Sequence, residues 1–144
     1  MTEEIRVGQL TIRFRLEGEE SAGTVSIFEV DVPAGVSVPM PHSHALYEET
    51  VYGLEGVLTF TADAKRIDVG PGDVLCIRRG VVHHFENAGE LDAKALAIVT
   101  PGSLGPGYFR ELGAILDAAA SAGTAPDPSA IATVMERHGL RLAT

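Results

Sequence analysis

The sequence predicts an all-β domain that is followed by two short helices. Short runs rich in β-branched and aromatic residues, separated by Gly, Pro and Asp, fill the first two-thirds of the chain. Such runs with regular turn signals are typical of a sandwich or barrel. After Thr100 the composition changes, and apolar residues recur at helical spacing. We therefore expect a barrel over residues 1–100 and a helical extension packed on it over residues 101–144.

The expected strands are short and are bounded by turn-forming residues. Five runs qualify by their content of Val, Ile, Thr, Phe and Tyr: residues 24–32, 47–54, 57–60, 74–77 and 95–99. Turn chemistry separates them at residues 33–35, 70–73 and 87–89. Two more strand-like segments, residues 41–49 and 82–85, carry four of the five histidines.

The extension begins with a Gly- and Pro-rich loop over residues 101–107, and the first helix is expected from about residue 108 to 120. Its apolar stripe consists of Phe109, Leu112 and Leu116. The stripe must be buried, either on the outer wall of the barrel or over its mouth. We expect the outer wall or a dimer surface, because helices commonly cover an apolar sheet face.

The second helix has recognisable start and stop signals. Asp127 is a good N-cap, Pro128 suits the first helical position, and Gly139 suits the position just past the end. Each helix is too short to be stable alone. We therefore expect both to pack on the barrel rather than to form a separate domain.

Charge and composition limit the classes of partner. The chain has 11 Lys+Arg against 20 Asp+Glu and a net charge of -9, so nucleic acid and anionic membrane are excluded as expected partners. No apolar run is long enough to span a bilayer, and the start lacks the pattern of a signal peptide. We expect a cytoplasmic protein. Its one cysteine, Cys76, forms no intrachain disulfide and is expected to be buried packing.

The histidines carry the strongest functional signal. In a strand, residues i and i+2 point to the same face, so His42 and His44 direct two imidazoles to one point. His83 and His84 are adjacent and point to opposite faces, so one of them can join the pair. A His-x-His pair also arises by chance, and an isolated histidine is usually a surface or core residue. The spacing around these residues decides between the two interpretations.

That spacing resembles the two motifs of the cupin family. The run Gly35-x6-His42-x-His44-x4-Glu49-x6-Gly56 is similar to the first motif, with one extra residue before its first histidine. The run Gly72-x5-Arg78-x-Gly80-x2-His83-x3-Asn87 is similar to the second, except that Arg78 stands where the family usually has proline. The resemblance implies a double-stranded β-helix, or jelly-roll, barrel.

The resemblance also implies a site for one divalent transition metal, with His42, His44, Glu49 and His83 as its ligands. Glu49 keeps the motif interval to Gly56, whereas Glu48 does not and should be a surface or interface carboxylate. Three imidazoles and one carboxylate suit iron, manganese, nickel, cobalt or zinc, and the ligand set does not choose among them.

Strand parity suggests which residues surround the metal. Met40 shares a face with His42 and His44, Tyr47 shares one with Glu49, and Phe85 shares one with His83. We expect Met40, Tyr47 and Phe85 to line a mostly apolar pocket, with Tyr47 able to donate a hydrogen bond. The alternative is that they are barrel core.

The activity is less specific than the fold, because one fold hosts many chemistries. The resemblance implies a metalloenzyme of the flavonol dioxygenase (quercetinase) type, which acts on a small organic molecule. Two alternatives stay open: a metal-dependent isomerase or lyase, and a non-catalytic sensor or storage protein that binds a small molecule. Small cupins often pair, so we also expect a homodimer.

Overall fold

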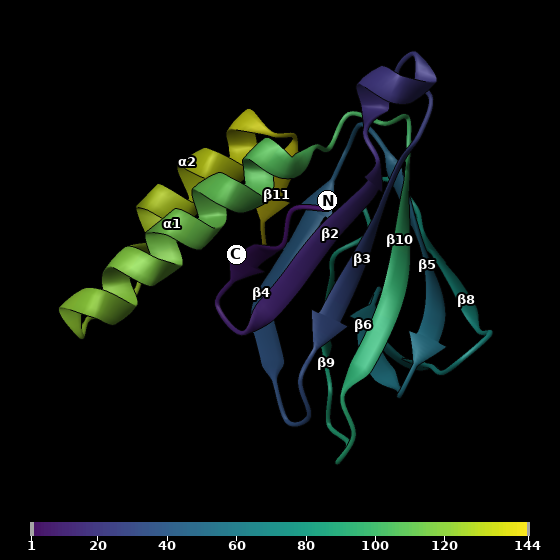
Figure 1. Cartoon of the computed structure of the whole chain (residues 1–144), viewed down its shortest axis with the longest axis horizontal. Helices are drawn as coiled ribbons and strands as arrows, with labels where there is room; N and C mark the ends of the chain where they lie inside the picture. Colours follow the sequence, from purple (N-terminus) through teal and green to yellow (C-terminus); the bar gives the residue numbers. More distant parts are fainter. Residues whose placement is uncertain (1, 144) are drawn as a thin grey trace.

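The computed structural model describes residues 2–143, apart from the side chain of Pro39. Its core is formed by two antiparallel sheets that face each other (Figure 1). The first sheet has six strands in the spatial order β1 (Ile5–Val7), β2 (Leu10–Leu16), β3 (Ser26–Val32), β10 (Ala93–Thr100), β5 (Glu48–Glu55) and β8 (Val74–Ile77). The second has five strands in the order β11 (Leu140–Leu142), β4 (Ser37–His44), β9 (His83–Glu86), β6 (Leu58–Ala62) and β7 (Lys65–Val69).

This arrangement confirms the predicted fold class, a mostly β fold of two sheets with two helices near the C-terminus. The five expected strands correspond to β3, β5, β6, β8 and β10, and the two histidine segments fall on β4 and β9. Strands β1, β2, β7 and β11 were not predicted. A short 3-10 helix, Gly18–Ser21, also joins β2 to β3.

The hydrophobic core lies between the two sheets. Strand β3 alternates strictly between buried and partly exposed residues, and most of β10 does the same. One face of each strand is therefore apolar and directed to the interior, as expected for a sheet with one covered face. Phe28 of β3 and Phe60 of β6 come from opposite sheets and are both buried.

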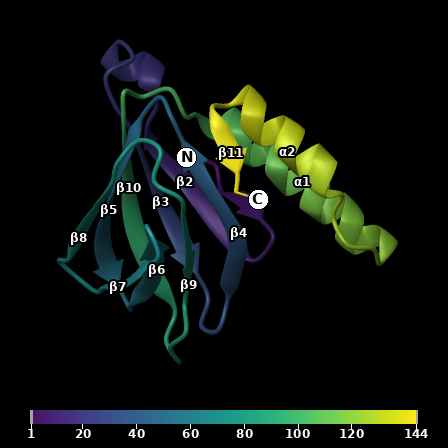
Figure 2. The same ribbon diagram turned by 180° about the vertical axis from the view of Figure 1, so that it is seen from behind.

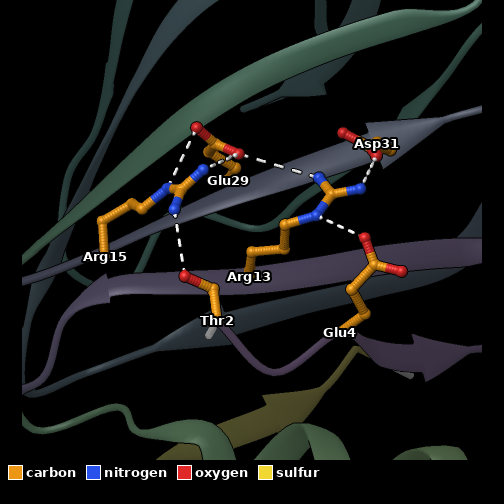
Figure 3. A network of polar contacts seen from close by, with 6 residues as sticks. All are labelled: Thr2, Glu4, Arg13, Arg15, Glu29 and Asp31. Atoms are coloured by element: carbon orange, nitrogen blue, oxygen red, sulfur yellow. Dashed lines mark hydrogen bonds and ion pairs between the residues drawn. The ribbon is translucent and has the colours of Figure 1, made fainter.

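The outer face of the six-stranded sheet carries a network of charged side chains (Figure 3). Arg13 on β2 bonds to Asp31 at 2.6 Å and to Glu4 at 2.8 Å. Arg15 lies 3.2 Å from Glu29. These residues alternate along β2 and β3 with the core residues, so the network and the core occupy opposite faces of one sheet.

Helices α1 (Pro106–Ala122) and α2 (Pro128–Arg137) lie side by side along one side of the sandwich (Figures 1 and 2). The predicted N-cap of α2 is confirmed, because the Asp127 carboxylate accepts a hydrogen bond from the Ser129 backbone N–H. Gly139 follows the helix with φ of 85°, a left-handed conformation that favours glycine.

Helix α1 packs directly on the backbone of β1. A Cβ atom added at Gly113 would lie 2.3 Å from the carbonyl oxygen of Arg6, so only glycine allows this approach. Helix α2 packs against β11, the edge strand of the other sheet. The helix pair therefore bridges the edges of the two sheets.

The position of the helices differs from the sequence-based expectation. Phe109 and Leu112 of the apolar stripe line a cavity between the sheets, rather than covering an outer wall. Helical periodicity shows that a face is buried, but it does not identify the surface that buries it. The expectation of an outer wall followed the commoner arrangement of helices on a sheet face. Strand β11, which anchors α2 beside β4, was absent from the prediction.

Two further observations concern the sequence-based expectations. Cys76 is exposed on β8, so the expectation of buried packing was wrong. Strand β8 is an edge strand, and Cys76 lies on the face opposite the core residue Ile77. In residues 2–143, no helix has the length and apolar character needed to cross a membrane.

Candidate metal centre

Three strands from both sheets bring the predicted ligands together. His42 and His44 lie on β4, and His83 lies on the neighbouring β9 of the same sheet. Glu49 lies on β5 of the facing sheet, at the start of the strand. In His44, Glu49 and His83, one potential ligand atom of each residue lies within 4.8 Å of the others. The two sheets thus close around a small polar cluster.

Backbone carbonyls orient the imidazole rings. The Nδ1 atoms of His42, His44 and His83 lie 2.8, 2.9 and 2.9 Å from the carbonyl oxygens of Met40, Tyr47 and Val81. A carbonyl oxygen only accepts hydrogen bonds, so each Nδ1 carries the proton in these contacts. In a neutral ring, Nε2 then keeps its lone pair. Metal-binding histidines are usually oriented in this way through the other ring nitrogen.

The free ring nitrogens converge on the carboxylate. The Nε2 atoms of His44 and His83 are buried and form no hydrogen bond with any described residue. His44 Nε2 lies 3.5 Å from a carboxylate oxygen of Glu49. Buried polar atoms without partners are rare, and each requires an explanation. Two lone pairs and one carboxylate that face the same point form a donor set that fits a divalent transition metal.

His42 lies beside this cluster. Its ring centre is 4.4 Å from that of His83 and 6.3 Å from that of His44. It lines the same cavity as Glu49 and His83. The cluster with close ligand atoms comprises the other three residues, so a role for His42 as the fourth ligand is a proposal.

Burial lowers the pKa of two of the imidazoles, those of His42 and His83. Desolvation, with a smaller repulsion from His83, lowers the pKa of His42 to about 4. Desolvation also lowers the pKa of His83. Burial alone would raise the pKa of Glu49, but the interactions with His44 and the other imidazoles outweigh it and lower the pKa. The site therefore presents neutral nitrogen donors and an ionised oxygen donor near neutral pH, the forms that bind metal.

The residues expected to line the pocket occupy different positions. Phe85 lines the cavity and packs on Phe60, with ring centres 5.3 Å apart. Tyr47 is buried and stacks on the His44 ring at 4.3 Å, and its hydroxyl has no partner among the described residues. Met40 is partly buried and lines the cavity together with Phe85. Tyr47 thus supports the ring of a candidate ligand.

Two other polar residues, Glu48 and His138, lie outside the cluster of candidate ligands. Glu48 forms an exposed ion pair with Arg79 at 2.6 Å. His138, which follows α2, contacts Glu111 of α1 at 2.9 Å. Neither residue belongs to the cluster of His44, Glu49 and His83.

The cluster opens into an apolar cavity of about 110 Å³ that both sheets and both helices line. Sequence reasoning missed one polar residue here, Tyr108, which lies in the first turn of α1 and lines the cavity with His42 and Glu49. Tyr108 precedes the stripe residue Leu112 by four positions, so the helical period places both on one face. The sequence therefore indicated that Tyr108 lies on the apolar face of the helix, but it did not indicate which surface this face covers.

Comparison with known proteins identifies the family. Residues 28–99 match the family model described as Cupin domain. The match covers half of the chain and includes His42, His44, Glu49 and His83. The chain belongs to the cupin family, and the cluster of His44, Glu49 and His83 is typical of a cupin metal site.

Individual proteins of known sequence share only part of this chain with moderate identity. The chain is 36% identical over 75 residues to quercetin 2,3-dioxygenase from Bacillus subtilis, a match that covers 50% of this chain and 21% of that enzyme. The chain thus spans less than two thirds of the length of the curated relatives it matches.

Two solved structures show a similar arrangement of strands. A predicted oxalate decarboxylase from Thermotoga maritima has a TM-score of 0.63 and 26% identity, covering 70% of this chain and 92% of that one. The polyketide cyclase RemF from Streptomyces resistomycificus has a TM-score of 0.58 and 25% identity, covering 69% and 72%. These proteins have different activities, so the likeness establishes the family and not the reaction.

Proposed function

We propose that this cupin is a metalloenzyme that holds one divalent transition metal through His42, His44, Glu49 and His83 and acts on a small organic molecule in a dioxygenase-like reaction. The observation that carries the proposal is the convergence of the free His44 and His83 Nε2 atoms with the Glu49 carboxylate at the end of an apolar cavity. The similarity to quercetin 2,3-dioxygenase supports the reaction type.

The metal would supply Lewis acidity and, if it is iron or another redox-active ion, electrons for oxygen chemistry. The chain's own residues hold and orient the donors. The carbonyls of Met40, Tyr47 and Val81 fix the ring orientations, and the stacked Tyr47 ring supports His44. The Glu49 carboxylate balances part of the charge of the cation. The apolar walls exclude water from the bound molecule.

The experiment that tests this proposal begins with metal analysis of the protein purified from its native source. We expect about one equivalent of iron or another redox-active metal, and oxygen uptake when a small aromatic or enol-type compound is added. Recombinant loading is a weaker test, because affinity order need not follow the physiological metal. Protein that contains no transition metal, or that contains metal and consumes no oxygen with any enol-type compound, would contradict the proposal.

A second candidate is a non-oxidative reaction of the isomerase or lyase type. It is favoured by the likeness to the predicted oxalate decarboxylase, of which the chain covers 92%. Tightly held zinc in the native protein, together with turnover that leaves dissolved oxygen unchanged, would favour this candidate over the dioxygenase. A third, non-catalytic role as a small-molecule binding protein would show ligand binding without any turnover.

We also propose a homodimer. The six-stranded sheet ends in the edge strand β8, on which Val74 is 61% exposed. Leu96 and Ile98 alternate with buried residues of β10 and so lie on the same outer face. An exposed edge and an apolar face are both covered when two copies pair. Sedimentation velocity at micromolar concentration should give twice the mass of the chain, and a monomer alone would refute the dimer.

A further inference from the structure

The cavity beside the candidate metal centre has few polar side chains in its lining. Among its described lining residues, the side chains that carry nitrogen or oxygen are His42, Glu49, His83 and Tyr108. The other described lining side chains are hydrocarbon or aromatic groups or the thioethers of Met40 and Met135. A molecule that fills this cavity must therefore place its polar atoms together at the cluster and its apolar part against the walls.

The charge of the lining also restricts the ligand. No Lys or Arg is found among the described lining residues, whereas Glu49 contributes a negative charge. A bound divalent metal could pair with one anionic group at the cluster, but a phosphate or second carboxylate in the apolar part of the cavity would lack a cationic partner, and burying it there is costly. A phosphorylated sugar or a dicarboxylate therefore does not suit this cavity, although solved cupins with such names share its fold.

The volume sets an upper limit on size. The cavity of about 110 Å³ has room for roughly 7 to 11 water molecules, at 10–15 Å³ for each. A ligand of roughly ten non-hydrogen atoms fits this space by the same measure. Larger polycyclic molecules would require the walls to move.

Helix α1 contributes one polar side chain, Tyr108, and apolar side chains to the lining of the cavity. Tyr108 is 4% exposed, and its ring is held by Phe109 at 5.0 Å and by His138 at 5.4 Å between ring centres. Burial and the nearby Glu49 charge raise the pKa of Tyr108, so its hydroxyl stays protonated and acts as a donor. Leu112, one turn further along the helix, lines the apolar part.

We propose that Tyr108 contacts the ligand, donating a hydrogen bond to an oxygen-bearing head group held at the histidine cluster, and that the ligand is a small, mostly apolar molecule with adjacent oxygen atoms at one end. This inference rests on the proposed function, since the cluster must hold a metal to receive the oxygens. It adds the ligand class and assigns a binding role to the C-terminal helices.

The test uses zinc-loaded protein, because zinc supports binding without redox turnover. Calorimetric titration with 4-methylcatechol should give an affinity at least about 10-fold higher than with glucose 6-phosphate. Tyr108→Phe should weaken 4-methylcatechol binding by about 5- to 10-fold, as expected for one hydrogen bond. Tyr52→Phe is the matched control, because Tyr52 lies on β5 outside the cavity lining and should bind normally.

Zinc content, measured after each titration, separates the two proposals. A wild-type protein that retains no zinc would defeat the proposed function. A zinc-loaded wild type that prefers glucose 6-phosphate would overturn the ligand class. A zinc-loaded Tyr108→Phe variant that binds 4-methylcatechol as tightly as the wild type would overturn the role of Tyr108.

A second pair of variants tests whether helix α1 forms the wall of the cavity that contacts the ligand. Leu112→Ala should enlarge the cavity and raise the affinity ratio of 4-tert-butylcatechol to 4-methylcatechol by about 5-fold or more. Leu116→Ala, on the same helix but outside the lining, should leave the ratio unchanged. Equal ratios for the two variants would show that α1 does not contact the ligand.

Discussion

Two polar clusters occupy opposite faces of the six-stranded sheet, and they are built in opposite ways. On the outer face, Arg13 and Arg15 of β2 face the carboxylates of Glu4, Glu29 and Asp31 (Figure 3). On the inner face, Glu49 of β5 faces the imidazoles of the other sheet.

The outer cluster supplies its own cations. Hydrogen bonds from Arg13 to Asp31 and Glu4 raise the pKa of the guanidinium further above its already high value. Its carboxylates therefore have permanent partners within the chain. The network stabilises the sheet and has no need of a ligand.

The inner cluster consists of nitrogen and oxygen atoms that can donate lone pairs to a metal. Unlike the outer cluster, it contains no arginine. Burial lowers the pKa of His42 and His83. The Nε2 atoms of His44 and His83 form no hydrogen bond with any described residue. The comparison shows that charge alone does not distinguish a structural cluster from a binding site. What distinguishes them is whether the chain supplies a partner of opposite charge, because Arg13 Nη1 and Asp31 Oδ1 of the outer cluster also form no hydrogen bond but belong to ion-paired groups.

The largest effect is expected when a candidate metal ligand of the inner cluster is removed. We predict that His44→Ala lowers metal affinity by more than about 100-fold, because even the groups that support metal ligands typically contribute 10- to 100-fold. Equilibrium dialysis with zinc or cobalt measures the effect. His84→Ala, on the same strand as His83, is the control and should retain normal affinity. Unchanged affinity in His44→Ala would refute the site.

The pH dependence of the metal-free protein sharpens the comparison. The folded pKa of His42 is about 4, below the value of about 6.5 in the unfolded chain, so the unfolded state binds more protons between these values. Stability should therefore be full above about pH 6.5 and fall as pH decreases toward 4, by roughly 3 kcal/mol from this residue. Urea unfolding after chelation measures this loss. His42→Asn should flatten the dependence, and an equally steep loss in that variant would assign it to other groups.

Removing the central cation of the outer cluster should have a smaller effect. Arg13→Met leaves Asp31 without its closest partner, and we predict a loss of about 1–2 kcal/mol in the free energy of unfolding, between the values for exposed and buried pairs. Metal affinity should not change. Arg15→Met is the control, because Arg15 is more exposed and should cost less. A loss of metal from Arg13→Met would mean that the two clusters are coupled through the sheet.

The smallest effect is expected from Glu48→Gln. Glu48 precedes the candidate ligand Glu49, but it pairs with Arg79 at the surface. Exposed pairs contribute about 0–1 kcal/mol, so stability should hardly change, and metal content should remain normal. Glu49→Gln in the same assay should lose metal. Equal losses from both variants would show that the two carboxylates had been assigned to the wrong faces.

Local patterns predicted much of this molecule. The period of two in strands placed His42 and His44 on one face, and the motif spacing separated Glu49 from Glu48. These relations depend on neighbours in the chain, which the sequence contains directly. The N-cap at Asp127 was predicted for the same reason.

Relations between distant segments could not be predicted in this way. The contribution of Tyr108 to the cavity depends on where α1 docks, and that depends on the close approach of Gly113 to the backbone at Arg6. The amphipathic pattern of α1 is compatible with an outer wall as well as with a position between two sheet edges. The exposure of Cys76 likewise follows from the position of β8 at a sheet edge, which no local pattern specifies.

Strand β11 has a consequence for the order of events during synthesis. It pairs with the ligand-bearing strand β4, with Leu140 opposite His44 and Leu142 opposite His42. At a translation rate of about 5–20 residues per second, roughly 5 to 20 seconds separate His44 from its last strand partner. Throughout that interval β4 has an unpaired edge beside its histidines. A nascent chain of this protein is therefore exposed to edge-to-edge association, and to premature contact with cellular metal, until Leu140–Leu142 have been made and paired with β4.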